Sequence, residues 1–285
     1  MNKISYLKSV KVIDNGKRKI VLKKENHTIH EVYNLLENRK FEYYLNPIYR
    51  DNDYEIYPYI KEIDISKSDK SIDLIHIMSL LHNKTTSYEE ISLDEIKKIY
   101  EDIINEINMK YEYYLKLQDE YEQHINMTPK ELLLMKNISK IYYMLKLSRD
   151  NIELFYKNIE TENHIRKVQI HGNLSLSHIL ESEDKYIISW GNSRKDFPIV
   201  DLVNFYKNNY NDIDIKSLYE EYNRKYQLNN IEKHLFFSLI NIPKYIVEKN
   251  DYYLDTLEVK KIVDYLNKTI EFTLEQNKEN QETDK

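Results

Sequence analysis

Cysteine is absent from the 285-residue sequence, and glycine and proline are scarce, with three and five residues. Without cysteine the chain can form neither disulfides nor thiolate metal sites and nucleophiles, which excludes several enzyme classes. The glycines matter because a backbone that closely approaches a phosphate usually relies on residues without a Cβ atom. Only Gly16, Gly172 and Gly191 could serve this purpose.

The chain also lacks an excess of basic residues and any long apolar run. Its formal net charge is −6, and its lysines alternate with acidic residues, which argues against nucleic-acid binding. No apolar stretch approaches the ~20 residues of a membrane span. The N-terminal segment mixes lysines with apolar side chains, unlike a secretory signal. We therefore expect a globular protein of the cytoplasm without nucleic-acid partners.

Residues 1–62 have the pattern of a small β-rich lobe with one helix. Asp14-Asn15-Gly16 is typical of a tight turn between two strands. The apolar side chains of Val32, Leu35 and Leu36 share one helical face. The predicted elements are strands over 3–12, 19–23, 43–49 and 55–59 and a helix over 30–39.

Helical spacing dominates from residue 63 onward. Ser92 with Glu95 and Thr128 with Glu131 form capping boxes, each of which marks a helix start. Pro129 suits the first helical position of the second. Helices are predicted over 72–82, from 93 past 114, over 129–147, 198–206, 215–226 and 231–249 with a kink at Pro243, and from a cap at Asp255.

Two short apolar strands interrupt the helices at 168–171 and 186–190, and we interpret residues 168–190 as a β-ribbon. The fold class is therefore predicted to be α+β with two lobes. The predicted N-terminal lobe spans residues 1–62, and the helical C-terminal lobe spans 63–276, with a helical insert over about 88–160. A polar segment, 277–285, is predicted to form an unstructured tail.

The ribbon contains the most informative motif. It consists of His171-Gly172-Asn173-Leu174-Ser175-Leu176-Ser177-His178-Ile179-Leu180, followed by Tyr186-Ile187-Ile188-Ser189-Trp190. This segment resembles the catalytic region of the aminoglycoside phosphotransferase and choline kinase-like family, where the pattern is His-Gly-Asp-x-x-x-x-Asn-Ile-Leu and then Ile-Asp-Trp. The spacing is the same, so the resemblance implies a bilobal fold like that of protein kinases.

Three positions depart from the family pattern, and each departure removes a chemical role. In the family the first Asp accepts the proton of the substrate hydroxyl, while the Asn and the second Asp hold Mg²⁺. Here Asn173 stands in place of the base, and a neutral amide is no useful proton acceptor. His178 and Ser189 replace the two metal ligands, and neither supplies an anionic oxygen. We therefore expect no metal site.

Other parts of the resemblance are structural and remain. Lys23 resembles the family's phosphate-contacting lysine, Glu31 its ion-pair partner, and Tyr59 a residue of the hinge between lobes. Asp201 resembles the aspartate that braces the catalytic loop, and His171 is assigned a structural role in that loop. The family's Gly-rich phosphate loop is a further departure, since Gly16 is the one glycine in this part of the sequence. ATP and Mg²⁺ are therefore expected as cofactors only if nucleotide binding is retained.

The helical insert is similar to the kinase-like proteins of Firmicutes and mollicutes that are related to spore-coat kinases. The Asn126-Met127-Thr128-Pro129 run lies in its middle. The tyrosines of the stretch 111–114 fit a helix face packed on the lobe or a partner-binding surface.

Simpler interpretations compete at several positions. A lone histidine such as His171 is more often buried and hydrogen-bonded than catalytic, and Lys23 with Glu31 could be a surface ion pair. Ser177 beside His178 lacks a third partner for nucleophilic catalysis. A zinc site could be assembled only from histidines without helical spacing, combined with a glutamate. Those residues are His164, His171, His178 and Glu181.

Two functional hypotheses follow. The first is a pseudokinase that binds an unknown protein partner or a small ligand in the cleft between the lobes. The second is an active ATP-dependent phosphotransferase on a small hydroxylated or amino-sugar substrate. For the second, Asp196 and Asp201 are the nearby acidic candidates, and Asp201 fits loop bracing better than metal binding.

Overall fold

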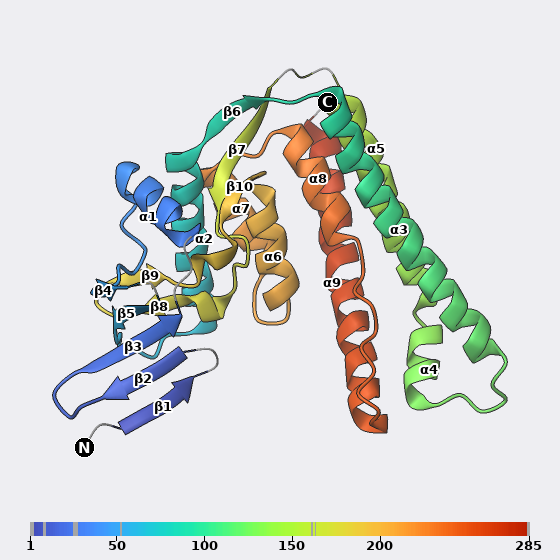
Figure 1. Ribbon diagram of the computed structural model, residues 1–285. Coiled ribbons are helices and arrows are strands. Elements are labelled where there is room, and N and C mark those ends of the chain that lie inside the picture. Colours follow the sequence, from blue (N-terminus) through green and yellow to red (C-terminus); the bar gives the residue numbers. More distant parts are fainter. Residues whose placement is uncertain are drawn as a thin grey trace.

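The computed structural model describes residues 3–7, 10–24, 28–51, 53–160, 162 and 164–283. It confirms the predicted α+β architecture, in which a small antiparallel sheet and one helix form the N-terminal part and most of the rest is helical (Figure 1). In the described ranges, no helix combines the length and the apolarity that a membrane crossing needs.

The N-terminal sheet has five antiparallel strands in the order β1-β2-β3-β5-β4. Helix α1 (Thr28–Asn38) follows β3, buries Ile29 and Leu36, and places the Tyr33 hydroxyl 3.3 Å from that of Tyr57. The strands are β1 (Lys3–Leu7), β2 (Val10–Asp14), β3 (Lys19–Lys24), β4 (Tyr49–Arg50) and β5 (Tyr54–Pro58).

The sheet differs from its prediction in two places. The predicted strand over 3–12 is two strands, β1 and β2, which pair with each other. Of the strand predicted over 43–49, only residue 49 belongs to a strand, β4, because residues 43–48 lie outside the sheet. Tyr44 instead forms an isolated bridge with Ile187, whose N–H donates to the carbonyl of Tyr43 at 2.8 Å. Tertiary pairing with a distant segment therefore overrides the local strand pattern.

The C-terminal lobe is built from long helices. Helices α3 and α5 lie side by side as an extended arm that ends at α4, and α5 also packs against α8 (Figure 1). The helices are α2 (Lys67–Thr85), α3 (Leu93–Glu122), α4 (Pro129–Met135), α5 (Ile138–Ile159), α6 (Ile199–Asn209), α7 (Ile215–Lys225), α8 (Asn230–Ile240) and α9 (Tyr252–Thr283).

Both predicted capping boxes are confirmed. The Ser92 and Thr128 side chains accept backbone N–H groups of Glu95 and Glu131, and the glutamates reach back to the cap residues. The helix predicted over 129–147 is wrong in one respect, since it breaks between α4 and α5. Asn137 leaves helical geometry and donates its side-chain amide to the Leu133 carbonyl, a local bond that competes with the helix.

The predicted kinked helix over 231–249 is also wrong, because α8 ends at Ile240, before Pro243. Proline restricts the residue before it to extended conformations, so the chain leaves the helix. The predicted cap at Asp255 moves to Asp251, whose carboxylate accepts the N–H groups of Tyr253 and Leu254. Asp255 lies inside α9 and accepts the Lys249 N–H.

The last helix is longer than the sequence indicated. The backbone of α9 is helical through Thr283, which differs from the tail predicted from residue 277. Residues 284 and 285 lie outside the described ranges.

Two small sheets carry the motif region. Strand β7 (His164–Ile170) lies between β6 (Ser87–Glu90) and β10 (Arg194–Asp196), and β8 (Ile179–Glu181) pairs with β9 (Lys185–Ile187). The strand predicted over 186–190 ends early, since Ser189 adopts a left-handed φ of 72°.

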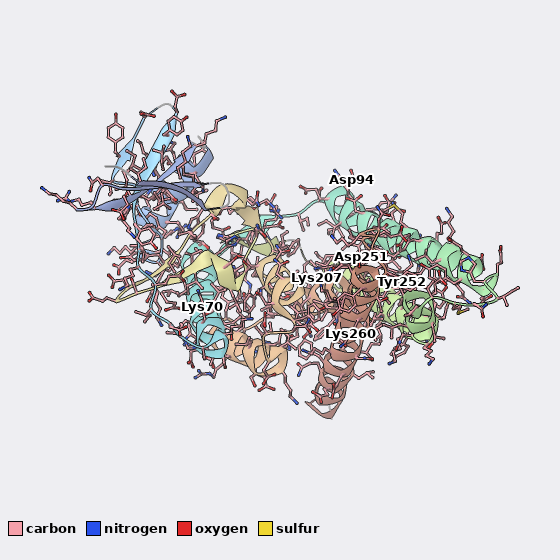
Figure 2. All side chains as sticks on the ribbon, turned by 90° about the horizontal axis from the view of Figure 1, so that it is seen from below. Lys70, Asp94, Lys207, Asp251, Tyr252 and Lys260 are labelled. Atoms are coloured by element: carbon pink, nitrogen blue, oxygen red, sulfur yellow. The ribbon has the colours of Figure 1, made fainter. Side chains whose placement is uncertain are left out.

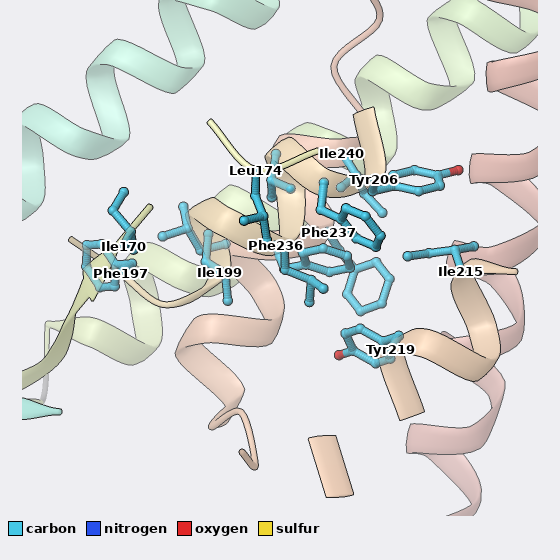
Figure 3. Packing of buried hydrophobic residues seen from close by; sticks show 14 of the residues in the cluster. Ile170, Leu174, Phe197, Ile199, Tyr206, Ile215, Tyr219, Phe236, Phe237 and Ile240 are labelled. Atoms are coloured by element: carbon cyan, nitrogen blue, oxygen red, sulfur yellow. The ribbon is translucent and has the colours of Figure 1, made fainter. Parts of the chain in front are cut away.

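Apolar side chains from the motif region enter the C-terminal core. Ile170 and Leu174 are buried together with Phe236 from α8 and Tyr219 from α7 (Figure 3). The base of the motif loop is therefore fixed by core packing as well as by hydrogen bonds.

A neighbouring pair in α5 tests this core. Phe155 is fully buried and its ring lies 6.3 Å from that of Phe197. Phe155→Ala should lower the free energy of unfolding by about 3–5 kcal/mol, because it removes transfer energy and leaves a cavity. Leu154 is 43% exposed, so Leu154→Ala should change it by less than about 1 kcal/mol. Equal losses in urea unfolding would contradict the packing described.

Candidate functional site

The site begins with Asp201, a fully buried carboxylate in the first turn of α6. Its Oδ2 accepts the backbone N–H of His171 at 2.7 Å, and its Oδ1 accepts that of Gly172 at 2.8 Å. His82 of α2, also fully buried, lies with Nε2 3.4 Å from Oδ2. The carboxylate thus joins α6, α2 and the start of the motif loop, where the resemblance places a bracing aspartate.

The charge of Asp201 is stabilised by these donors. Burial alone would raise the pKa of the carboxyl, but hydrogen bonds from His82 and from the His171 N–H hold it below its usual value. His82 is oriented in turn by Tyr222 of α7, whose hydroxyl lies 2.7 Å from Nδ1. This arrangement suits a His82 ring that accepts at Nδ1 and donates from Nε2.

Gly172 has to be glycine at this point of the loop. Its φ is +81°, and an added Cβ atom would meet the Asn192 carbonyl oxygen at 2.2 Å. Two asparagines of α6 support the loop from the other side. Asn204 donates to the Gly172 carbonyl and Asn208 to the Leu174 carbonyl, both at 3.3 Å.

His171 is a buried part of the scaffold. Its Nε2 donates to the Ile188 carbonyl at 2.9 Å, and its ring packs edge-on against Trp190. Burial lowers the pKa of His171, so that the ring is neutral near pH 7. The neutral ring therefore ties the motif loop to the neighbouring ribbon through the Ile188 carbonyl.

The three replaced positions lie on the same loop and ribbon. Asn173 is exposed, and its carbonyl oxygen accepts from Nδ1 of His178 at 2.6 Å. Ser189 is partly buried at the left-handed turn after β9. Across the described ranges, no three His, Cys, Asp or Glu side chains gather in a way that could hold a metal ion.

A cleft of about 270 Å³ separates the N-terminal sheet from the ribbon. Lys23, Tyr59 and Ser189 all line it, so the structure brings these three predicted positions together. Asn173 and His178 are not among the lining residues. The other lining residues are mostly apolar: Val10, Val12, Val21, Tyr33, Leu45, Tyr57, Pro58, Ile60, Glu62, Leu180, Ile187 and Ile188.

The structure does not pair Lys23 with Glu31, the partner that the sequence predicted. Glu31 is exposed on α1 and forms no ion pair with Lys23 in the described residues. Glu55 is fully buried on β5, directly opposite Lys23 in the strand register. Burial lowers the pKa of Lys23, and the charge of Glu55 opposes that shift. Sequence reasoning missed Glu55, because register between strands is a tertiary property.

Glu55 is held by two further side chains. Tyr57 donates its hydroxyl to Oε2 at 2.7 Å, and Arg50 places Nε 3.2 Å from Oε1, close enough for an ion pair but without hydrogen-bond geometry. The alternation of residues 54–57 does put Glu55 and Tyr57 on one face, and this was the available sequence signal.

Asp201 and Asp196 give a matched test of loop bracing. Asp201→Asn should lower the free energy of unfolding by about 3 kcal/mol near pH 7, because it removes the charge that both N–H groups need. Asp196 pairs with Arg194 at the surface, so Asp196→Asn should cost less than about 1 kcal/mol.

The pH dependence has a definite sign. Because folding lowers the pKa of Asp201, its contribution is present above the unfolded-state value of about 3.9 and is lost as the pH falls through the lower folded value. The stability gap between wild type and Asp201→Asn should therefore narrow in acid denaturation profiles. A gap independent of pH would contradict the assignment.

Glu55 and Glu31 give a second matched pair. Glu55→Gln removes the negative charge that raises the pKa of Lys23, so that pKa should fall further, while Glu31→Gln should leave it unchanged. Titration of ¹³C-labelled lysine side chains by NMR measures both. If the pKa of Lys23 fell further in the Glu31→Gln variant than in the Glu55→Gln variant, the predicted pairing of Lys23 with Glu31 would be supported instead.

No protein-family model matches the sequence, and no curated protein matches it. Solved structures do match the fold. An aminoglycoside phosphotransferase from Alicyclobacillus acidocaldarius aligns with a TM-score of 0.68 at 8% identity, over 96% of this chain and 92% of that one. The AMP-bound spectinomycin phosphotransferase APH(9)-Ia aligns with a TM-score of 0.60 at 13% identity, over 94% and 92%.

A choline kinase, LicA from Streptococcus pneumoniae, also aligns, with a TM-score of 0.45 at 12% identity over 94% of this chain and 90% of that one. Identities of this size speak for the fold alone. The chain therefore has the bilobal, protein-kinase-like fold of the aminoglycoside phosphotransferases, as the motif spacing predicted.

Proposed function

We propose that this protein is a pseudokinase, a phosphotransferase-fold protein that binds a small ligand or a partner in its inter-lobe cleft without transferring phosphate. The observation that carries the proposal is the chemistry of Asn173, His178 and Ser189 on an otherwise braced loop. The scaffold of the site is kept, while the groups that would perform the reaction are replaced.

Each replacement removes a specific capability. The Asn173 amide cannot take a proton from an alcohol near neutral pH. Ser189 supplies a neutral hydroxyl where a magnesium ion would need a carboxylate, and His178 offers nitrogen to a cation that prefers oxygen. The Nδ1 atom of His178 is moreover engaged with the Asn173 carbonyl.

The cleft itself supports ligand binding. Its walls are largely apolar, and Lys23 contributes a cation whose pKa is lowered by burial. Clefts of this character, with few polar groups, are the usual form of small-molecule sites. A nucleotide that enters this cleft would have to bind without a metal-bridged triphosphate, since Glu62 is the one carboxylate in the lining and no group of three possible metal ligands gathers in the described residues.

The alternative function is an active ATP-dependent phosphotransferase on a small hydroxylated or amino-sugar substrate. The fold neighbours are phosphotransferases, which favours this alternative. The two acidic residues that could serve as base or metal ligand in such an enzyme already have other hydrogen-bond or ion-pair partners. Asp201 accepts two loop N–H groups, and Asp196 pairs with Arg194 and accepts the Phe197 N–H.

We also propose that the protein lies in the cytoplasm and, on the resemblance of its insert, that it is related to the spore-coat-associated kinase-like proteins of Firmicutes and mollicutes. A pull-down from the native cell would identify the partner.

Restoring the three family residues together tests the proposal. Asn173→Asp, His178→Asn and Ser189→Asp in one chain should create Mg²⁺-dependent thermal stabilisation by ATP that the unmodified protein lacks, because a ligand that binds only the folded state raises its stability. Aspartate tolerates the left-handed backbone of Ser189.

ATP titrations with Mg²⁺ and with EDTA, followed by thermal unfolding, provide the measurement. Glu183 is an exposed residue of the same ribbon, so Glu183→Gln serves as a charge control that should leave both responses unchanged. Metal-dependent stabilisation of the unmodified protein, or phosphate transfer as fast as in the restored variant, would favour the active enzyme instead.

A further inference from the structure

Three lysines from separate elements gather beside the motif loop, away from the Lys23 cleft. Lys110 comes from α3, Lys207 from the last turn of α6, and Lys244 from the segment after α8. The Lys244 ammonium donates to the Lys207 carbonyl at 3.1 Å. Lys110 is only 5% exposed, although a lysine at this depth is ordinarily paired with a carboxylate.

The usual pairing is missing here. In the described residues none of these three ammonium groups has a carboxylate oxygen within ion-pair distance. Glu106 of α3 is the acidic residue that acts on Lys110 and Lys207, and it does so from beyond that distance. Glu248, in the same segment as Lys244, is paired with Lys130. The lysines therefore leave a surplus of positive charge.

The segment that carries Lys244 is held in place by tyrosines of α3. Tyr114 donates its hydroxyl to the Lys244 carbonyl, and Tyr113 accepts the Ile246 N–H. The Tyr245 ring packs edge-on against Tyr113 and covers the Lys110 ammonium at 3.1 Å. Such a contact stabilises a cation but does not neutralise it, so Lys110 adds positive charge to the cluster from a buried position.

Burial is the main influence on the pKa values in this cluster, and the neighbouring lysines add to it at Lys207. Burial lowers the pKa of Lys110 to about 8. Burial also lowers the pKa of Lys207 to about 8, with Glu106 opposing the shift and Lys244 and Lys110 adding to it. An anion between these lysines would offset both the unfavourable burial of their charges and their mutual repulsion.

The cluster is coupled to the motif loop through α6. Asn204 and Asn208, which flank Lys207 in that helix, donate to loop carbonyls of Gly172 and Leu174. Lys207 is labelled in Figure 2, together with the exposed Lys260 of α9.

We propose that Lys110, Lys207 and Lys244 form a binding site for the phosphate group of a small ligand. This site goes beyond the inter-lobe cleft, because it uses none of the residues that line that cleft. It also narrows the ligand class, since a protonated amino sugar would be repelled where a phosphate monoester would receive charge-assisted hydrogen bonds.

Inorganic phosphate is the probe for a thermal-unfolding titration at pH 7 and constant ionic strength, without ATP or Mg²⁺. The unmodified protein should show saturable stabilisation, and a double Lys207→Gln and Lys244→Gln variant should bind at least about tenfold more weakly. Lys260→Gln is the matched control and should behave like wild type. Phosphate also stabilises proteins generally, so an equal shift in all three proteins would overturn the proposal.

A second measurement uses only the unmodified protein. Acetic anhydride at pH 7.5 acetylates neutral amines, and phosphate should slow the reaction at Lys207 and Lys244 while leaving the rate at exposed Lys260 unchanged. Mass spectrometry of the digested protein reads all three sites. Equal acetylation rates at Lys207 with and without phosphate would contradict the proposed phosphate site. That result would leave the proposed function of the Lys23 cleft untouched.

Discussion

The buried carboxylate of Asp201 is the contact on which the motif region depends. It accepts the backbone N–H groups of His171 and Gly172 and lies against His82, which is itself oriented by Tyr222. A buried charge is costly unless donors surround it, and here the donors come from the motif loop and from α2. The carboxylate therefore couples the loop, α2 and α6 into one rigid unit.

This bracing does not depend on the side chains at the three positions that depart from the family pattern. Asp201 holds the loop through backbone groups, which are the same whatever side chains follow. The side chains of Asn173 and His178 lie downstream of the braced residues, so their replacement leaves the brace intact. The fold can accordingly persist at 8% to 13% identity with solved phosphotransferases, since its geometry rests on a few contacts rather than on the reacting groups.

Charge is distributed unevenly over the molecule. The inter-lobe cleft has apolar walls and one lysine, steadied by the buried Glu55 of the adjacent strand. The region between α3 and α6 instead concentrates Lys110 and Lys207, which in the described residues have no carboxylate within ion-pair distance and only Glu106 acting from farther away. Coulombic attraction in such partly desolvated places is stronger than in water, so these two regions differ in the ligands they favour.

The sequence by itself determined the elements whose signals are local. The capping boxes at Ser92 and Thr128 need only residues three apart, and the spacing from His171 to Trp190 was enough to indicate the fold. The tertiary structure decided what depends on distant partners. Three features join residues that come close only when separate elements pack: the position of Glu55, and not Glu31, opposite Lys23, the bridge between Tyr44 and Ile187, and the lysine cluster.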